Sequence, residues 1–426
     1  MSVITVATIA QTEPQDGDCR VIGAPRAVAS CGLANQSGLT DWRDRPFAEA
    51  ATTLKEPDDL SRNVYCVFGI PVDAIEMATV VTSIEVAAVN KAPFVISTFN
   101  LNYLVTGLLE PEFRESLSLS DLCTADGMPI VWIAQLLGIP VKKRVAGSDI
   151  FDALKARPEF QQQLSVFLFG DSQDATAAVS RKLNEKRTAL SCVGWISPGY
   201  GTVEELSQDH FVDKINSSNA DFLVVALSAK KGVSWVQRNH HRLRIPIRAN
   251  FGATIKFQAG VIERAPYIMR KFGLEWLWRI KEEPYLWKRY WRDGAVLLRL
   301  LLTHVLPLAI SVRWLQLRRK HNGNYLLIES THDSDAVTLS LSGYAVAEHV
   351  DEAISCFKHA LSTRKRIIID FAKTRAIDAR FFGLLLMLRK QLKARGAVPK
   401  MVNISPRSER LFRLHALGYL LSSGVD

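Results

Sequence analysis

The stretch that decides the fold runs over residues 92–149. Its three informative parts are APFVISTFNLNYLV (92–105), DLCTADGMPIVWIAQLLG (121–138) and KKRVAGSD (142–149). The first apolar run ends in the polar residues Thr98 and Asn100, and Asp126 stands just before the next long apolar run. Polar residues just past the carboxyl end of a strand face the ligand crevice of an open α/β sheet. We therefore predict that Thr98, Asn100 and Asp126 form one site.

The wider segment from Val64 to Gly252 alternates apolar runs with helical patterns. We expect helices near residues 74–89, 101–109, 111–117 and 130–137, and strands at 64–68, 93–97, 165–170, 192–197, 221–228 and 246–252. Almost continuously apolar strands separated by helices predict a parallel sheet buried on both faces. The predicted fold class is α/β, with a Rossmann-like, doubly wound parallel sheet.

This segment resembles a known enzyme family. From about Asn63 to Trp291 it is similar to the WecG/TagA/CpsF glycosyltransferases (glycosyltransferase family 26). It matches their motifs in order, with GIPVDAI at 69–75, T-x-N at 98–100, ADG at 125–127, RVAGSD at 144–149 and GLEWLWRIKEEP at 273–284. Five ordered matches are far more specific than any single motif. The resemblance implies an enzyme of bacterial surface polysaccharide synthesis. Such an enzyme moves a hexosamine or hexose from a UDP-sugar to a polyprenyl-diphosphate-linked acceptor, with inversion.

The resemblance also implies roles for individual residues. Asp126 matches the family's catalytic base, and Thr98 and Asn100 match positions that hold substrate hydroxyls. Arg144 is the cation best suited to the diphosphate, because a guanidinium can bind phosphate oxygens bidentately. Asp149 either holds Arg144 or caps the next helix. Taken singly, Asp126 could be a turn residue, Thr98 and Asn100 helix caps, and Arg144 a surface charge. Their order and spacing together favour the site.

Two loops are candidates for binding the donor. Gly170 follows an apolar strand and precedes a helix, where backbone N–H groups and the helix dipole can receive phosphate. Any strand-to-helix turn of an α/β protein can look the same. The resemblance places the second loop, residues 197–201 with Tyr200, near the donor nucleotide.

The chain departs from the family pattern after the predicted strand at 221–228. Gly232 and Val233 stand where the family usually has Gln and Glu, so any role of those side chains in holding the donor is lost or moved. We expect Lys231, or Lys230 beside it, to contact a donor phosphate instead, on the basis of charge and position alone.

Residues 263–320 differ in charge from the rest of the chain. From Arg264 to Lys320 there are thirteen Lys and Arg against four Asp and Glu, in a chain of net charge +10, and five of the nine Trp. Basic residues interleaved with Trp, Tyr and Leu suit a segment that lies in a membrane interface. Trp and Leu at helical spacing are also common in protein cores. The apolar run 295–310 is shorter than the ~20 residues that a spanning helix needs. We predict a helical appendage that associates with an anionic membrane surface.

The N-terminal segment and the cysteines bear on location. Residues 1–62 show no sustained periodicity and predict a mostly disordered extension. The opening residues lack the basic region of a signal peptide. The six cysteines show no paired spacing and suit a reducing compartment: Cys19, Cys31, Cys66, Cys123, Cys192 and Cys356. We expect a cytoplasmic protein, peripherally associated with the inner face of the cell membrane, with no nucleic-acid partner.

Residues 324–426 resemble a STAS (anti-sigma-factor-antagonist-like) domain. The motifs LSLSG at 339–343 and IIIDFAKTRAID at 367–378 precede two predicted helices, as in that family. Members regulated by phosphorylation carry a Ser after the Asp of the second motif, whereas Ala379 follows Asp378 here. Asp378 is therefore expected to cap the next helix. The segment predicts a small α/β domain that docks a protein partner.

The predicted organisation is an extension (1–62), a transferase domain (63–262), the appendage (263–320) and the STAS-like domain (324–426). There is no DxD at a strand end, and the adjacent His240 and His241 would point apart on a helix, so we expect neither a metal nor a cofactor. A nicotinamide-dependent oxidoreductase is disfavoured because no GxGxxG follows the first strand. The alternative to an enzyme is a non-catalytic scaffold or regulatory protein of polysaccharide assembly that acts through the STAS-like domain.

Overall fold

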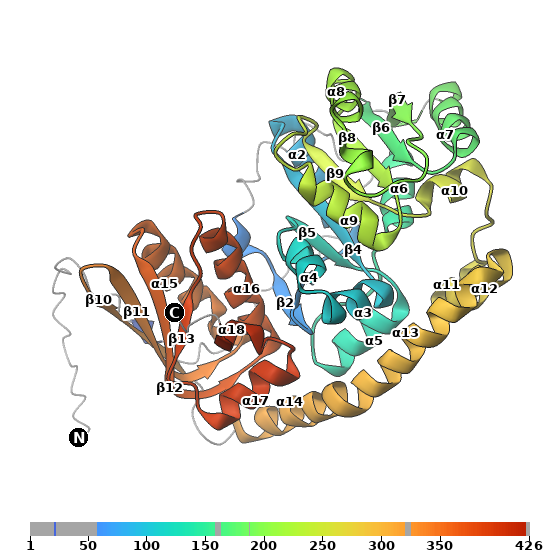
Figure 1. Ribbon diagram of the computed structural model, residues 1–426. Helices are drawn as coiled ribbons and strands as arrows, with labels where there is room; N and C mark the ends of the chain where they lie inside the picture. The colour runs from blue at the N-terminus through green and yellow to red at the C-terminus, as the bar shows by residue number, and fades with distance from the viewer. Residues whose placement is uncertain (1–20, 23–57, 158–162, 187, 320–324, 423–426) are drawn as a thin grey trace, which may run out of the picture.

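The structure is a computed structural model, which describes residues 21–22, 58–157, 163–186, 188–319 and 325–422 (Figure 1). We call residues 58–262 the N-terminal domain, 263–319 the appendage and 325–422 the C-terminal domain. The strands are β1 Val21–Ile22, β2 Val64–Val67, β3 Ile70–Asp73, β4 Phe94–Phe99, β5 Leu122–Ala125, β6 Leu164–Gly170, β7 Leu190–Ile196, β8 Phe222–Ala226, β9 Ile247–Asn250, β10 Leu326–His332, β11 Ala336–Ala345, β12 Arg366–Ile377 and β13 Lys400–Val402.

The helices alternate with the strands in the N-terminal domain. Its helical elements are η2 Asp59–Ser61, α2 Met77–Asn90, α3 Leu101–Leu109, α4 Pro111–Ser118, α5 Met128–Leu136, α6 Gly147–Lys155, α7 Gln173–Glu185, η3 Glu205–Ser207, α8 Asp209–Ser217, α9 Ala229–Arg238 and α10 Thr254–Ala259. Those of the C-terminal domain are η6 Ala347–His349, α15 Val350–Ser362, α16 Ala379–Lys393, α17 Pro406–Leu414 and α18 Tyr419–Ser422.

The N-terminal domain is built on an eight-stranded sheet in the order β2-β3-β5-β4-β9-β8-β6-β7. All its neighbours are parallel except the β2–β3 hairpin. Helices α2, α6, α7 and α10 pack on one face, and α3, α4, α5, α8 and α9 on the other. Successive residues of a strand point to opposite faces, so Val224 of β8 enters the first core and Val225 the second. The predicted α/β class and the doubly wound sheet are confirmed.

Two strands of this sheet were missed by the sequence analysis. They are β3 and β5, each only four residues long. β3 contains Pro71, which removes a backbone donor and weakens the strand signal. β5 is interrupted by the polar Thr124. The omission matters because β5 ends at Ala125, directly before Asp126.

The appendage is helical and ends in one long helix (Figure 1). Its elements are α11 Tyr267–Lys271, α12 Glu275–Glu282, η4 Pro284–Leu286, α13 Trp287–Leu300, the π-helical η5 Leu301–Val305 and α14 Leu306–Arg319. By length and composition, the 31 residues from Pro284 to Trp314 could cross a membrane. The apolar run 295–310 is therefore part of a longer helix. The length of the run alone does not decide whether this helix could span a membrane.

The long helix has one packed face and one exposed face. Leu300, Val305 and Leu308 are buried in a core shared with α5 and α3. A stripe of apolar side chains is exposed on the helix: Trp287, Trp291, Leu298, Leu302, Leu306, Ile310 and Trp314. On an α-helix, side chains four residues apart differ in direction around the axis by ~40°. The π-helical segment η5 has more residues per turn, so it turns the side chains after it back toward the direction of those before it. The apolar stripe therefore stays on one side of the helix.

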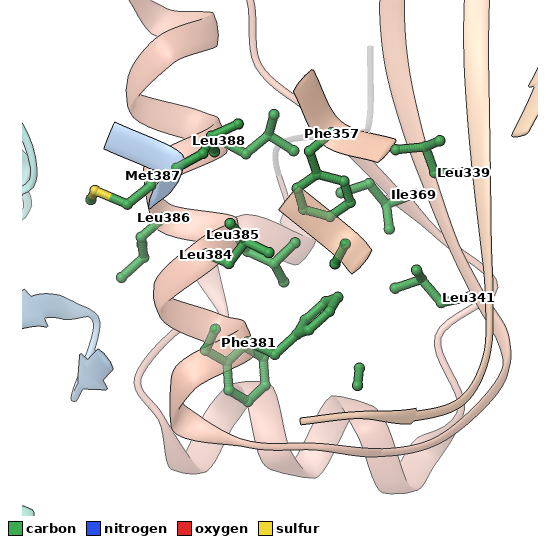
Figure 2. Close-up of a cluster of buried hydrophobic side chains, with 14 of the residues drawn as sticks. Leu339, Leu341, Phe357, Ile369, Phe381, Leu384, Leu385, Leu386, Met387 and Leu388 are labelled. Atoms are coloured by element: carbon green, nitrogen blue, oxygen red, sulfur yellow. The ribbon is translucent and has the colours of Figure 1, made fainter. Parts of the chain in front are cut away.

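The C-terminal domain contains the second sheet, in the order β1-β10-β11-β12-β13. Figure 2 shows Phe381, Leu384 and Leu385 of α16 pointing toward Leu339 and Ile369 of the sheet. Asp378 caps α16 as predicted, since its carboxylate accepts a hydrogen bond of 2.9 Å from the Phe381 amide. The predicted helix after each of the two motifs is present, as α15 and α16, and the predicted small α/β domain is confirmed.

The predicted extension lies mostly outside the described residues, as do its Cys19, Cys31 and Trp42. Its described parts are ordered. Val21–Ile22 pair with β10, and residues 58–62 form η2 and lead into β2. Leu60 is buried in the core of the C-terminal domain. The predicted boundary at residue 63 therefore leaves out residues 58–62, which pack on a domain distant in sequence.

Candidate active site

The candidate site lies where β4 and β5 end. These strands are adjacent and parallel, with Thr98 opposite Thr124 and Phe99 opposite Ala125. The Asp126 amide donates a hydrogen bond of 2.8 Å to the Phe99 carbonyl. Asn100 and Asp126 therefore emerge side by side at the carboxyl edge of the sheet, as the sequence predicted.

Thr98 and Asn100 occupy different local positions. Thr98 lies inside β4 and is buried. Asn100 is the N-cap of α3, where its Oδ1 accepts a hydrogen bond of 3.1 Å from the Tyr103 amide. The helix-cap alternative therefore applies to Asn100 and not to Thr98. Contact of either residue with a substrate hydroxyl stays a prediction.

The segment before α6 brings Arg144 to Asp126. It runs along the end of β5, where the Val145 amide donates to the Ala125 carbonyl at 2.8 Å and the Thr124 hydroxyl donates to the Val145 carbonyl at 2.8 Å. The Arg144 side chain is only 15% exposed and lies 3.5 Å from the Asp149 carboxylate. Arg144 is thus a half-buried cation beside the site and not a free surface charge.

Asp149 holds arginines and does not cap α6. The N-cap of α6 is Ala146, and Asp149 lies in the first helical turn. Its carboxylate pairs with Arg144 and Arg264, and lies 3.9 Å from Arg270. Of the two roles left open by the sequence, the structure supports the first.

The appendage completes this cluster with residues that the sequence analysis did not assign. Arg264 pairs with Asp149 and donates to the Ser148 hydroxyl at 3.0 Å, and Glu275 pairs with Arg144. The turn before α12 packs tightly on α5, since a Cβ on Gly273 would lie 2.8 Å from Met128 Cβ. The excess of arginines in the appendage was visible in the sequence, but which of them reach the site was not.

The charges at the site are only partly balanced. Burial raises the pKa of Asp126 to about 7; Arg144 opposes the rise, whereas Glu275 and Asp149 add to it. The Nε atoms of Arg264 and Arg270 are buried and, among the described residues, have no hydrogen-bond partner. Unpaired buried donors of this kind suit an anionic ligand. A carboxylate that titrates near neutral pH can act as a general base.

The remaining predicted residues lie at the same edge of the sheet, beyond β9 and β8. Gly170 ends β6 with φ +116°, and a Cβ there would lie 2.7 Å from the Ala226 carbonyl oxygen. Tyr200 is fully exposed in the loop after β7. Lys231 donates to the Gly201 carbonyl at 2.6 Å and so tethers that loop, while Lys230 lies 2.8 Å from Glu110. Their contacts with a donor stay predictions.

Position 232 has no room for a side chain in this structure. A Cβ on Gly232 would lie 2.2 Å from the side-chain amide of Asn250, at the end of β9. Val233 is buried in the core formed with α3 and α5. The side chain of Asn250 therefore occupies the space that a larger residue at position 232 would need.

Within the described residues, no three His, Cys, Asp or Glu side chains are placed to hold a metal ion. Metal-independent activity stays a prediction. His240 and His241 lie in the turn after α9, not within a helix, and their rings meet edge to face with centroids 4.9 Å apart. The prediction that the two rings point apart was wrong, because the helix ends at Arg238.

The comparison with known families assigns this α/β fold to the glycosyltransferases. The model of the glycosyl transferase WecG/TagA/CpsF family matches residues 65–309, and that of the STAS domain matches 328–421. The chain belongs to the WecG/TagA/CpsF family and carries a C-terminal STAS domain.

Two relatives share the name N-acetylglucosaminyldiphosphoundecaprenol N-acetyl-beta-D-mannosaminyltransferase. The relative from Bacillus spizizenii is 27% identical over 200 residues, which are 47% of this chain and 75% of the relative. The relative from Staphylococcus aureus strain MW2 is 24% identical over 235 residues, 54% of this chain and 88% of the relative.

Proposed function

We propose that this glycosyltransferase moves a hexosamine or hexose from a UDP-sugar to a hydroxyl of a polyprenyl-diphosphate-linked sugar, with inversion. The names of its relatives support an acceptor of this class. Asp126 takes the proton of the acceptor hydroxyl, which attacks the anomeric carbon as the bond to UDP breaks. The base and the leaving group lie on opposite faces of the sugar, so a single displacement inverts the anomeric carbon.

The observation that carries this proposal is that Asp126 lies close to a cluster of arginines that pair with Asp149 and Glu275. Burial raises the pKa of Asp126 to about 7, so a large fraction of this carboxyl group is ionised at neutral pH and can accept a proton. Arg144, Arg264 and Arg270 gather around Asp149. Guanidinium groups stabilise the charge that develops on a departing diphosphate.

The appendage is proposed to lie on the inner surface of the membrane. Its apolar stripe includes Trp287, Trp291 and Trp314, which suit the interface between lipid and water. The opposite face of the same helix is packed on the N-terminal domain, so lipid cannot surround the helix unless that packing is lost. This geometry supports in-plane binding to anionic lipid.

The enzymatic proposal is tested with purified chain, a panel of UDP-sugars and a short-chain prenyl-diphosphate sugar. UDP release is measured for the wild type, for Asp126→Asn, and for Asp213→Asn, an exposed Asp on α8. We expect release with at least one donor, its loss in Asp126→Asn, and no change in Asp213→Asn. Equal release by the wild type and Asp126→Asn would remove Asp126 as the base. A folded wild type inactive with every donor would favour the scaffold alternative.

The membrane proposal is tested by sedimentation with vesicles of phosphatidylglycerol or phosphatidylcholine. Trp291→Ser should weaken binding to the anionic vesicles about tenfold, because a mostly exposed indole no longer enters the interface. Val398→Ser changes an exposed apolar residue of the C-terminal domain and is the matched control. Equal binding by both variants would contradict the proposed surface.

A further inference from the structure

Helix α16 of the STAS domain is buried on two sides. Eleven of its fifteen residues are buried, more than one amphipathic face provides. One side packs on the sheet of the C-terminal domain, whereas Leu386 and Met387 point away from that sheet in Figure 2. The other side meets β2 of the N-terminal domain. There Arg380 donates to the Val64 carbonyl at 3.0 Å, and a Cβ on Gly383 would lie 2.1 Å from the Val64 carbonyl oxygen.

The apolar cores of the two domains are continuous at this contact. Leu60, Val64 and Cys66 precede or form β2, yet they belong to the core cluster of the C-terminal domain. In return, Ala379 of α16 belongs to the cluster that contains α3, α4 and α5. The outer side of α16, which could dock a separate partner, is thus occupied by the same chain.

A buried set of charges crosses the contact. Lys390 of α16 is only 11% exposed, and its ammonium lies 2.9 Å from Asp59 and 2.7 Å from Asp121. Arg62, 8% exposed, lies 2.8 Å from Asp59 and 2.7 Å from Asp73. Burial opposes the charge on Arg62, but these two carboxylates raise its pKa above the usual value.

These carboxylates also hold the strands that carry the candidate site. The second oxygen of Asp121 accepts a hydrogen bond of 2.9 Å from the Val95 amide, at the start of β4. Asp73 accepts one of 2.7 Å from the Cys123 amide, at the start of β5. Asp126 follows Asp121 by five residues, ~16 Å along an extended strand. Lys390 is therefore connected to both strands at the end opposite the site.

We propose that the STAS domain binds the transferase domain of its own chain and acts as a positioning subunit of the enzyme. Lys390 is the positioning residue. It neutralises Asp59 and Asp121, and Asp121 can then hold the start of β4 while the adjoining β5 presents Asp126. This inference rests on the proposed transfer reaction for its kinetic test, but not for its binding test.

The kinetic test compares Lys390→Met with Lys393→Met. Lys393 lies 2.8 Å from Glu115 at the same contact but is 43% exposed, so it is the matched control. We expect Lys390→Met to lower kcat about tenfold, to leave the donor KM within twofold and to shift the pH profile of kcat. Lys390→Arg, which keeps the charge, should recover most of the kcat. A lower unfolding midpoint with unchanged kcat and pH profile would show a purely structural role and overturn the proposal.

The binding test inserts a protease site within residues 320–324 of the full chain. After cleavage the two halves should elute together at low salt and keep the activity of the uncut chain. In ~1 M salt they should still elute together, because the charge pairs are buried and lie within 2.9 Å. In urea below the unfolding midpoint of the uncut chain, which weakens apolar burial, they should separate and lose activity. Separation at low salt, or full activity of a separated N-terminal half, would overturn the proposal even if Lys390→Met fails to fold. If the uncut chain releases no UDP, the proposed reaction fails, while co-elution still decides whether the domains form one unit.

Discussion

The two ends of strands β4 and β5 differ in how their charges are balanced. At the amino end, Asp73 and Asp121 are each paired with a cation and also accept a backbone hydrogen bond. At the carboxyl end, Asp126 has a raised pKa, and two buried arginine Nε atoms lack partners among the described residues. Satisfied charges hold a structure together, whereas unsatisfied charges are available to a ligand. Removing a charge at the carboxyl end should therefore lower activity more than stability. Removing one at the amino end should lower stability more than activity.

The largest effect is expected for Asp126→Asn. We expect kcat to fall about 10³-fold, because the amide cannot accept the acceptor proton. The urea midpoint should not fall, since the change removes a carboxylate that burial disfavours. A midpoint lowered as far as that of a core variant would show that Asp126 is structural.

The next effect is expected at the amino end. Arg62→Met should lower the free energy of unfolding by about 3 kcal/mol, because it leaves Asp73 buried without its cation. Urea denaturation followed by circular dichroism measures the change. Arg238→Met breaks an exposed pair with Glu204 and should cost less than about 0.5 kcal/mol. Equal losses in both variants would contradict the difference between the two ends.

The pH dependence of kcat and of stability tests the carboxyl end, where Asp126 has a raised pKa. Because the pKa of Asp126 is about 7, kcat should rise about tenfold per pH unit below 7 and level off above it. The folded state binds this proton more tightly than the unfolded chain, whose carboxyl has a pKa near 3.8. Asp126 therefore lowers stability as the pH rises from about 4 to 7, and this part of the slope should vanish in Asp126→Asn. A kcat constant from pH 5 to 8 would rule out a base of this pKa.

The smallest effect is expected for Glu275→Gln. Glu275 helps to raise the pKa of Asp126, so its neutralisation should move the pH profile of kcat toward lower pH. At pH 6 we expect kcat to increase about threefold. This is less than the roughly tenfold increase that a pKa lowered by one full unit would give. Glu263→Gln, an exposed change in the same appendage, should leave the profile unchanged. A shift of the profile toward higher pH would contradict the prediction that Glu275 raises the pKa of Asp126.

Much of the fold could be predicted from local patterns. The apolar runs of β4, β6 and β8 and the cap at Asp378 depend on neighbouring residues, and the structure confirms them. The strands β3 and β5 were missed because Pro71 in β3 and the polar Thr124 in β5 weaken the strand pattern of two short segments. The outer side of α16 was also missed, since an apolar helix does not reveal in its sequence which surface it covers.

The site could be predicted only in part. Asp126 and Arg144 lie within one motif-rich stretch, so their closeness followed from the order of the motifs. Arg264 and Glu275 reach the same place from more than 100 residues away. No local rule gives such a contact, because the path of the appendage is set by packing on α5.

The position of β2 has a consequence for synthesis of the chain. Val64 and Cys66 share a core with residues of β10 and of the elements after it, more than 250 positions later. A domain that folds as it leaves the ribosome normally finds its contacts among residues already made. Here the first strand of the larger sheet is covered by a domain that is made later, so premature termination near residue 320 would release a protein with an uncovered apolar edge.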